Sequence, residues 1–293
     1  MKRLIRLLIG LMLLGLLSGC AESGSNAQVA ATTLPVYDFT LRLCQGTPIT
    51  VTRLVTEQVS CLHDYSLNVR QVRAVEKAEM VVISGAGLEE FLGDLLLDAP
   101  IVDASQGITL LCPEEDQEGH DHDDGHHHEE DPHIWLSPEN AKRMAQNICT
   151  GLSEQYPKYA QTFAQNLTGL QEDLDALLQY GKQQLETLAC RELITFHDGF
   201  SYFAQAFDLT ILEAVEEESG SEASAKELIH LIEEVEHHSL PAVFTEKSGS
   251  DSAANVISRE TGCAVYTLDM AMAGDSYFDA MYHNIDTIKE ALQ

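Results

Sequence analysis

Short apolar runs alternate with amphipathic stretches along most of this chain, beginning at Val29. Residues 80–83 are wholly apolar and predict a buried strand, whereas segment 66–78 carries its apolar residues at helical spacing. Strands that alternate with helices are typical of βαβ units and parallel sheets. The pattern therefore predicts an α/β fold. The predicted strands are 29–34, 48–54, 80–83, 101–102, 193–196, 209–215, 242–244 and 265–268. The predicted helices are 35–44, 66–78, 88–97, 202–207, 223–237, 252–260 and 275–292.

The longest helical pattern lies in the middle of the chain. From Tyr156 to Leu188, apolar residues recur at three- and four-residue steps. A helix of about 32 residues would be about 48 Å long, enough to cross a whole molecule. Just before it, Ser137 followed by Pro138 predicts the start of a shorter helix that continues through Ile148.

Two segments on either side of this helix resemble each other faintly. Segments 66–84 and 224–245 each contain a helix followed by a buried strand. The similarity is consistent with two similar lobes with mainly parallel sheets, joined by one long rigid helix. We expect an N-terminal lobe at 29–155, a linking helix at 156–189 and a C-terminal lobe at 190–293.

The first residues form a targeting segment rather than part of the fold. A basic start is followed by an apolar run at 7–17, which is shorter than the ~20 residues a membrane-spanning helix needs. The sequence Leu-Ser-Gly-Cys that ends at Cys20 resembles a bacterial lipobox. That resemblance implies a lipoprotein signal peptide at 1–20, a lipid on Cys20 and a flexible tether at 21–28. An uncleaved anchor helix is the alternative.

Composition narrows the function further. The formal net charge of −30 argues against nucleic-acid binding, which requires a basic surface. Six cysteines besides Cys20, in an exported chain, favour disulfides, and six allow fifteen pairings. We expect Cys190 to pair with Cys263, because each precedes a strand. No CxxC occurs, which argues against a thiolate zinc site. The six are Cys44, Cys61, Cys112, Cys149, Cys190 and Cys263.

An acidic, histidine-rich run precedes the predicted Ser137 helix. Between Pro113 and Pro132 the chain holds five histidines and ten carboxylates, with no Lys or Arg. Such a run cannot bury a core and should be mobile, and its imidazoles suit zinc and neighbouring metals. We expect loop 114–130 to gather metal. Its histidines are His120, His122, His126, His127 and His128.

Four other side chains lie near predicted strand ends, where α/β sheets bind their ligands. His63 precedes the 66–78 helix, His133 closes the histidine-rich run, His197 directly follows a strand and Asp269 ends the last one. Three imidazoles and a carboxylate are a plausible four-coordinate zinc shell. Spacing along the sequence does not bring them together.

Several strings then resemble one family, the substrate-binding lipoproteins of zinc and manganese ABC importers. They are HDYSL from His63, DPHIWLSPENA around His133, ITFHDGFSYFAQAFDL around His197 and GDSYFDAMYHNIDTIKEAL near the C-terminus. The resemblance covers nearly all of the mature chain. It implies two α/β lobes bridged by a rigid helix, with metal in the cleft between the lobes.

The resemblance also implies a ligand set and partners. His63 and His133 would come from the first lobe, and His197 and Asp269 from the second, with water as the alternative to Asp269. Asp64 and Asp198 would either orient imidazoles or cap helices. The function implied is extracytoplasmic zinc capture by a lipid-anchored monomer, with delivery to an ABC permease and its ATPase.

Alternatives are a manganese or iron carrier on the same scaffold and a secreted zinc hydrolase. Three imidazoles favour zinc over Mn²⁺, which prefers oxygen donors. Neither HExxH nor GxSxG occurs, which argues against a hydrolase. We therefore expect a binding protein rather than an enzyme.

Overall fold

The computed structural model describes residues 28–59, 62, 65–96, 100–111, 130–215 and 223–293. Several predictions lie outside these residues. They concern the signal peptide with Cys20, most of the tether, His63, Asp64, Cys61, Cys112 and the loop histidines His120, His122, His126, His127 and His128. No helix among the described residues is both long and apolar enough to span a membrane.

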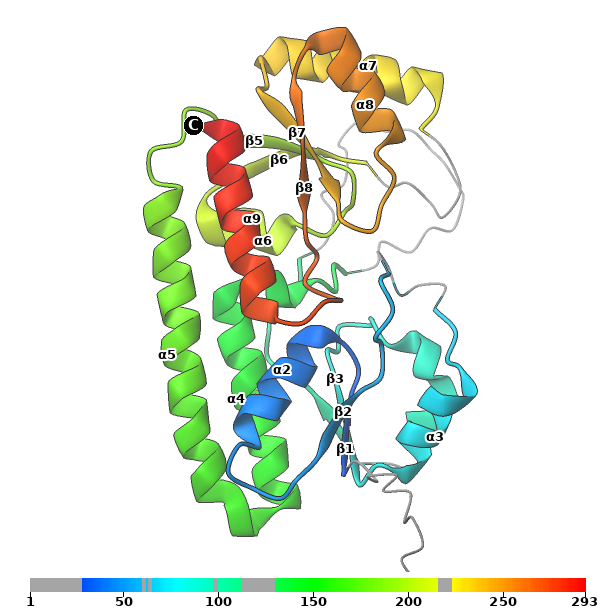
Figure 1. The fold of residues 1–293 in the computed structure, drawn as a ribbon, viewed down its shortest axis with the longest axis vertical. Coiled ribbons are helices and arrows are strands. Elements are labelled where there is room, and N and C mark those ends of the chain that lie inside the picture. Colours follow the sequence, from blue (N-terminus) through cyan, green and yellow to red (C-terminus); the bar gives the residue numbers. More distant parts are fainter. Residues whose placement is uncertain (1–27, 60–61, 63–64, 97–99, 112–129, 216–222) are drawn as a thin grey trace, which may run out of the picture.

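The first lobe is built on a four-stranded parallel sheet with the strand order β2-β1-β3-β4 (Figure 1). Its strands are β1 (Val29–Ala31), β2 (Val51–Arg53), β3 (Met80–Ile83) and β4 (Ile101–Asp103). Its helices include α2 (Leu34–Leu43) and α3 (Val69–Lys77), and α3 begins three residues after the predicted start at 66. Pro35 lies in the first turn of α2. Asn68 caps α3 in a reciprocal capping box with Gln71.

The second lobe repeats the plan with the strand order β6-β5-β7-β8, again all parallel. Its strands are β5 (Glu192–Thr195), β6 (Thr210–Ala214), β7 (Ala242–Glu246) and β8 (Ala264–Leu268). Its helices are α6 (Ser201–Phe207), α7 (Ala225–His238), α8 (Ser252–Thr261) and α9 (Tyr277–Leu292). The α/β prediction, with two similar lobes, is confirmed.

Two predicted helices differ from the structure. Segment 88–97 was expected to be an amphipathic helix, but Glu90–Leu96 forms 3-10 turns (η2) that are interrupted at Gly93, with φ 43° and ψ −130°. Glycine adopts this backbone conformation without the cost that a Cβ would impose.

The predicted linking helix 156–189 is shorter than expected. Helix α4 (Pro138–Gln155) starts at the predicted Ser137 cap and ends just before Pro157, in whose 3-10 turn (η4, Pro157–Tyr159) the chain reverses. Proline disfavours helical backbone at the preceding residue. The long helix is therefore α5 (Ala160–Gln184), whose 25 residues span about 38 Å.

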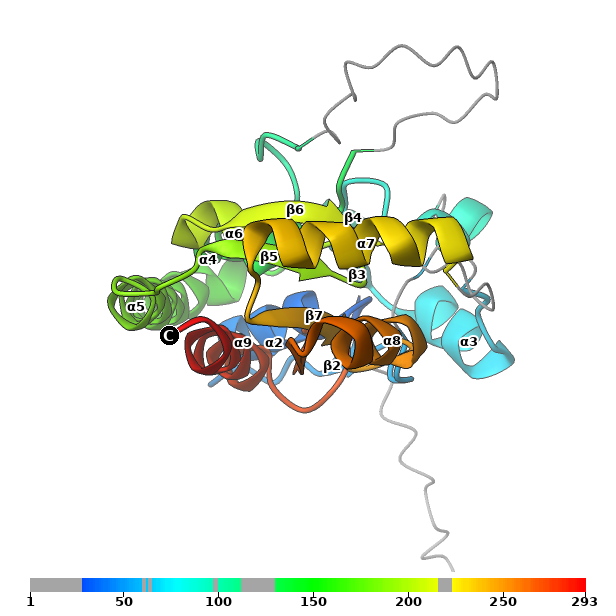
Figure 2. The same cartoon turned by 90° about the horizontal axis from the view of Figure 1, so that it is seen from above.

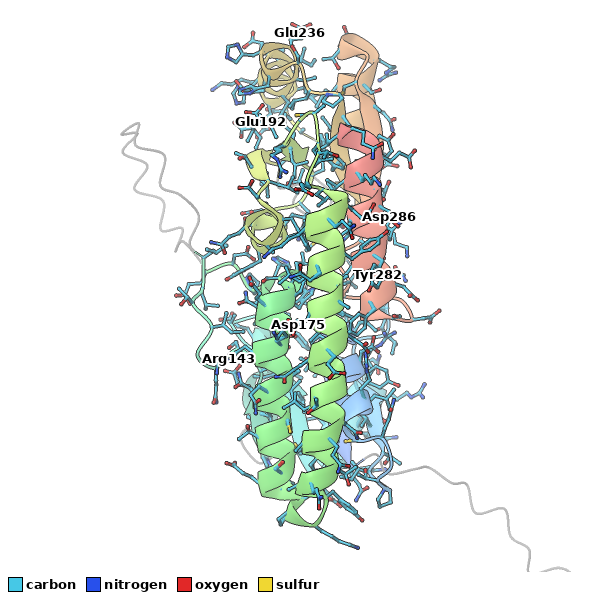
Figure 3. The ribbon with its side chains drawn as sticks, turned by 90° about the vertical axis from the view of Figure 1, so that its left-hand side faces the viewer. Arg143, Asp175, Glu192, Glu236, Tyr282 and Asp286 are labelled. Carbon is cyan, nitrogen blue, oxygen red and sulfur yellow. The ribbon has the colours of Figure 1, made fainter. Side chains whose placement is uncertain are left out.

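Helix α5 still joins the two lobes. It contacts α2 and α4 of the first lobe and α6 and α9 of the second. It runs along one side of the molecule in both overall views (Figure 1, Figure 2). Figure 3 shows it beside α4 at one end and beside α9 at the other.

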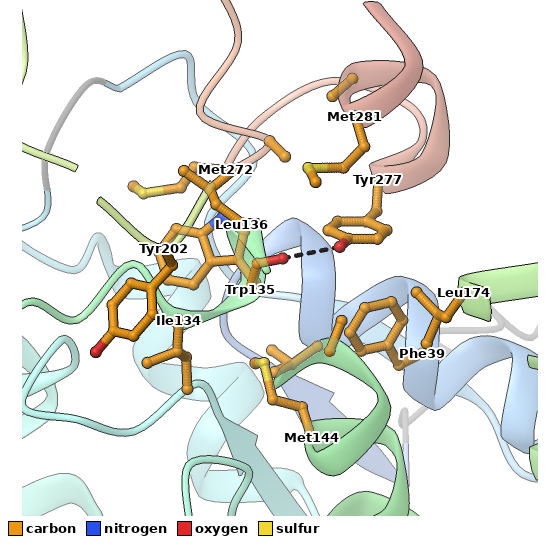
Figure 4. Packing of buried hydrophobic residues seen from close by; sticks show 14 of the residues in the cluster. Phe39, Ile134, Trp135, Leu136, Met144, Leu174, Tyr202, Met272, Tyr277 and Met281 are labelled. Atoms are coloured by element: carbon orange, nitrogen blue, oxygen red, sulfur yellow. Dashed lines mark hydrogen bonds between the residues drawn. The ribbon is translucent and has the colours of Figure 1, made fainter. Parts of the chain in front are cut away.

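One hydrophobic core crosses the boundary between the lobes (Figure 4). It contains Phe39 of α2, Leu174 of α5, Trp135 of the 3-10 turn η3 (Ile134–Leu136) and Tyr277 of α9. The Tyr277 hydroxyl donates a 2.8 Å hydrogen bond to the Trp135 carbonyl. The lobes are therefore held against each other by apolar packing as well as by the chain.

The expected disulfide between Cys190 and Cys263 is wrong. Both carry free thiols, as do Cys44 and Cys149. Cys190 precedes β5 and Cys263 precedes β8, and β7 lies between these strands. Two strand spacings amount to roughly 9.6 Å, whereas a disulfide needs Cα atoms within about 7 Å of each other.

Candidate metal centre

His133 is held at the boundary between the lobes by the buried turn that follows it. Ile134, Trp135 and Leu136 are fully buried, and the Trp135 indole N–H donates a 2.8 Å hydrogen bond to the carbonyl of Met270 in the second lobe. His133 itself is only 3 % exposed. A first-lobe residue is thus anchored against the second lobe.

Asp131 fixes the orientation of the His133 ring. Its Oδ1 accepts a 2.9 Å hydrogen bond from the His133 backbone N–H and lies 2.8 Å from His133 Nδ1. With Nδ1 bonded to this carboxylate, the Nε2 lone pair of His133 is directed away from it and is available to a metal. Sequence reasoning did not single out Asp131, although it lies two residues before a predicted ligand.

His197 supplies the second imidazole. It follows β5, at the edge of the sheet where the carboxyl ends of the strands lie, and its Nε2 is 3.4 Å from His133 Nε2. Two nitrogens bound to one tetrahedral zinc at 2.0–2.1 Å lie about 3.3 Å apart. The two nitrogens therefore have the separation that a shared zinc ion requires.

Glu246 lies beside His197 and was not assigned a role from the sequence. Its Oε2 is 3.9 Å from His197 Nδ1, and the residue is 4 % exposed at the end of β7. β5 and β7 are adjacent with Thr195 opposite Phe244, so His197 and Glu246 follow at matching positions. The sequence showed that Glu246 follows an apolar strand. It did not show that this strand lies next to the strand that ends before His197, and that strand order is what brings the two residues together.

Gly199 allows the two rings to approach each other. A Cβ at this position would lie 2.6 Å from Met270 Cε, 2.9 Å from His197 Cδ2 and 3.0 Å from His133 Nδ1. Any larger residue would have to displace the end of the Met270 side chain and the His197 ring, and it would press on the His133 ring. The glycine is therefore part of the construction of the site.

Asp269 lies at the same edge of the second sheet but makes other contacts. Its Oδ1 accepts the Ala271 N–H at 2.8 Å, and its Oδ2 accepts a hydrogen bond from Lys247 Nζ at 3.2 Å. It lines one pocket with Glu246, and Gln58 and Val59 of the first lobe line that pocket too. The residues that the structure describes contain no group of three or more His, Cys, Asp or Glu side chains that could hold a metal ion.

The structure thus brings His133 and His197 together, and it puts Asp269 in a pocket that is also lined by Glu246, the neighbour of His197. The assignment of Asp269 as a ligand stays a prediction. His63 and the loop histidines fall in undescribed segments, as noted above. The other histidines, His230, His237, His238 and His283, lie on α7 and α9 and are exposed or partly exposed, as expected.

The two ends of the histidine-rich loop are closed next to His133. The Asp131 N–H donates a 2.9 Å hydrogen bond to the Leu111 carbonyl. The Tyr202 hydroxyl bridges the same two residues, because it accepts from the Leu111 N–H at 2.9 Å and donates to the Asp131 carbonyl at 3.0 Å. Leu111 and Asp131, which flank the histidine-rich segment in the sequence, are therefore held together beside the candidate metal centre.

Known proteins give an independent view of this arrangement. Residues 29–291 match the family model for ZnuA, described as zinc-uptake complex component A, periplasmic. A solved structure of ZnuA is 30% identical, with a TM-score of 0.78 over 91% of this chain and 100% of that one.

Two curated relatives carry different metals in their names. The zinc-binding lipoprotein AdcA of Streptococcus pneumoniae is 29% identical over 99% of this chain, which spans only 61% of that relative's length. The manganese-binding lipoprotein MntA of Halalkalibacterium halodurans is 26% identical over 94% of this chain and 91% of its own.

Proposed function

This chain belongs to the ZnuA family of periplasmic zinc-uptake components, and from that membership we propose that it captures Zn²⁺ outside the cytoplasm. It then delivers the ion to an ABC permease and its ATPase. It is a binding protein that releases the ion unchanged, so it needs neither a nucleophile nor a general base.

One observation carries the choice of zinc as cargo. His133 Nε2 and His197 Nε2 lie 3.4 Å apart, and the Nδ1 of each faces a carboxylate, that of Asp131 or Glu246. Imidazoles oriented by carboxylates are typical of zinc sites. His63 supplies the third nitrogen in this proposal, and either Asp269 or a water supplies the fourth ligand.

Manganese is the second candidate cargo, and the carboxylates favour it. Glu246 and Asp269 line one pocket beside His197, and Mn²⁺ prefers oxygen donors. The name of the MntA relative also points to this metal. Three imidazoles nevertheless form a better zinc site than a manganese site, so zinc remains the first choice.

The remaining parts of the chain serve this capture. We propose that Cys20 carries a lipid that anchors a monomer to the outer face of the cell membrane. The loop histidines collect zinc more weakly than the centre does, because an acidic run whose composition cannot bury a core loses entropy when it orders around an ion.

Zinc titrations of the full mature chain against a competing chelator test the proposal. His133→Ala and His197→Ala should each weaken binding at least 100-fold, whereas the exposed His230→Ala on α7 should leave it unchanged. Removal of residues 114–130 should preserve one tight zinc, since Leu111 and Asp131 are already hydrogen-bonded and a short connection can join them. Loss of all tight zinc on that deletion would instead locate the tight site in the loop.

A further inference from the structure

Lys247 is paired with the carboxylate proposed as the fourth ligand. In the β7–β8 pair Glu246 lies opposite Leu268, so the next residues along the strands, Lys247 and Asp269, also lie opposite each other. The Lys247 backbone N–H continues the pairing with a 2.9 Å hydrogen bond to the Leu268 carbonyl. Its Nζ donates to Asp269 Oδ2 at 3.2 Å.

The rest of Asp269 is held rigidly. Its backbone N–H donates to Asn284 Oδ1, and Asn284 Nδ2 donates to its carbonyl, both at 2.7 Å. Its Oδ1 accepts the Ala271 N–H. Because Oδ1 already accepts a backbone hydrogen bond, Oδ2 is the oxygen more open to a cation, and Lys247 Nζ donates to it.

A lysine ammonium and a divalent cation compete for this one oxygen. The Lys247 side chain is 57 % exposed, so it can leave Asp269 and remain solvated. Because the two positive charges also repel each other, the lysine weakens any metal that binds through Asp269.

We propose that Lys247 is a residue that determines selectivity for zinc over manganese. This inference rests on the metal-binding function proposed above. Because Lys247 pairs with Asp269 Oδ2, a metal ion must displace the lysine before it can bind this oxygen. The remaining ligands are mainly imidazoles. Zinc tolerates this, because three nitrogens and a water complete a four-coordinate shell. Manganese depends more on carboxylate oxygen and is disfavoured.

Titration of zinc and manganese into the full mature chain and the Lys247→Gln variant tests the proposal. An ion pair whose lysine is solvent-exposed contributes little, so manganese affinity should rise about two- to fivefold. Zinc affinity should change less, so the preference for zinc over manganese, measured as the ratio of the two affinities, should decrease. Lys247→Arg, which keeps the charge and can keep the pair, should behave as the wild type does.

Two controls separate this role from a general effect of charge. Lys142→Gln also removes a lysine that is paired with an aspartate, Asp175, on the α4–α5 surface away from the cleft, and should change neither affinity. In an Asp269→Asn background, Lys247→Gln should no longer favour manganese. The proposal would be overturned if Lys247→Gln changed the zinc and manganese affinities equally, changed neither, or still favoured manganese in the Asp269→Asn background. Tight zinc binding by the wild type would leave the proposed function intact in each of these cases. A wild type without tight zinc would overturn both.

Discussion

Asp131 makes two contacts with His133, so we expect substitution of this carboxylate to weaken zinc binding. Asp131→Asn removes the charge that stabilises the Nδ1–H of His133 and lets the ring turn. Loss of such an orienting partner costs about 10- to 100-fold in metal affinity. Zinc titration should show this loss, whereas Asp175→Asn, on the exposed face of α5, should bind zinc as the wild type does. Equal affinities for both variants would mean that Asp131 does not orient the ligand.

A buried carboxylate elsewhere in the first lobe should make stability depend on pH. Burial raises the pKa of Glu89 from 4.5 to about 7, although hydrogen bonds from Thr32, Ser84 and Gly85 act in the opposite direction. The folded chain therefore holds this proton more tightly than the unfolded chain does. Its contribution to stability is fully present below pH 4.5 and is lost as the pH rises through 7, by about 3 kcal/mol in all.

The variant Glu89→Gln isolates that contribution. Glutamine stays neutral at every pH. The free energy of unfolding of the variant, measured in urea, should therefore fall less between about pH 4.5 and 7 than that of the wild type. The two proteins are compared by how steeply their free energies of unfolding change with pH. A loss of stability that is the same at every pH therefore does not affect the comparison. Parallel curves for the two proteins would show that Glu89 titrates alike in the folded and unfolded chains.

His197 was predicted from its place after an apolar strand, at the ligand-binding edge of a parallel sheet. His133 was predicted from its place at the end of the histidine-rich run, and the family resemblance joined the two in one ligand set. Sequence reasoning missed Glu246 and the Lys247–Asp269 pair. Those contacts depend on β7 lying between β5 and β8, and the order of strands in a sheet leaves no mark on local sequence. Asp131 was missed for a different reason, since an aspartate before proline also suits an ordinary turn.

At the scale of elements, two glycines in α5 form a matched pair. A Cβ at Gly181 would lie 2.2 Å from Phe207 Cε1 of α6, whereas a Cβ at Gly169 would meet nothing within 4 Å. Gly169→Ala should stabilise the chain by up to about 1 kcal/mol, because alanine is the better helix former. Gly181→Ala should destabilise it by about 1–3 kcal/mol, because the ring must move within a packed core. Thermal unfolding measures both, and a stabilising Gly181→Ala would show that α5 and α6 are loosely packed.

Most elements followed from apolar periodicity, and the exceptions have local causes. Pro157 lies in the 3-10 turn between α4 and α5, so the long helix begins at Ala160 rather than at Tyr156, where the apolar pattern starts. Gly93 interrupts the expected helix at 88–97. In both places one residue with unusual backbone preferences outweighs a side-chain pattern that remains compatible with a helix.

At the scale of the whole molecule, the shared core limits how far the lobes can move. Large hydrophobic interfaces restrain domain motion, and opening the cleft would expose apolar residues such as Trp135 and Tyr277 to water (Figure 4). We therefore expect no measurable change in the radius of gyration when the mature chain without residues 114–130 binds zinc. X-ray scattering with and without zinc measures it, and a clear contraction would indicate hinge closure instead.

The central claim is that one zinc ion binds between the lobes through histidines from both. Anomalous diffraction at the zinc edge, on crystals of the zinc-loaded chain without residues 114–130, tests it most directly. The account predicts a single strong peak within about 2.0–2.1 Å of both His133 Nε2 and His197 Nε2. A peak bound to only one lobe, or no peak between these two nitrogens, would contradict it.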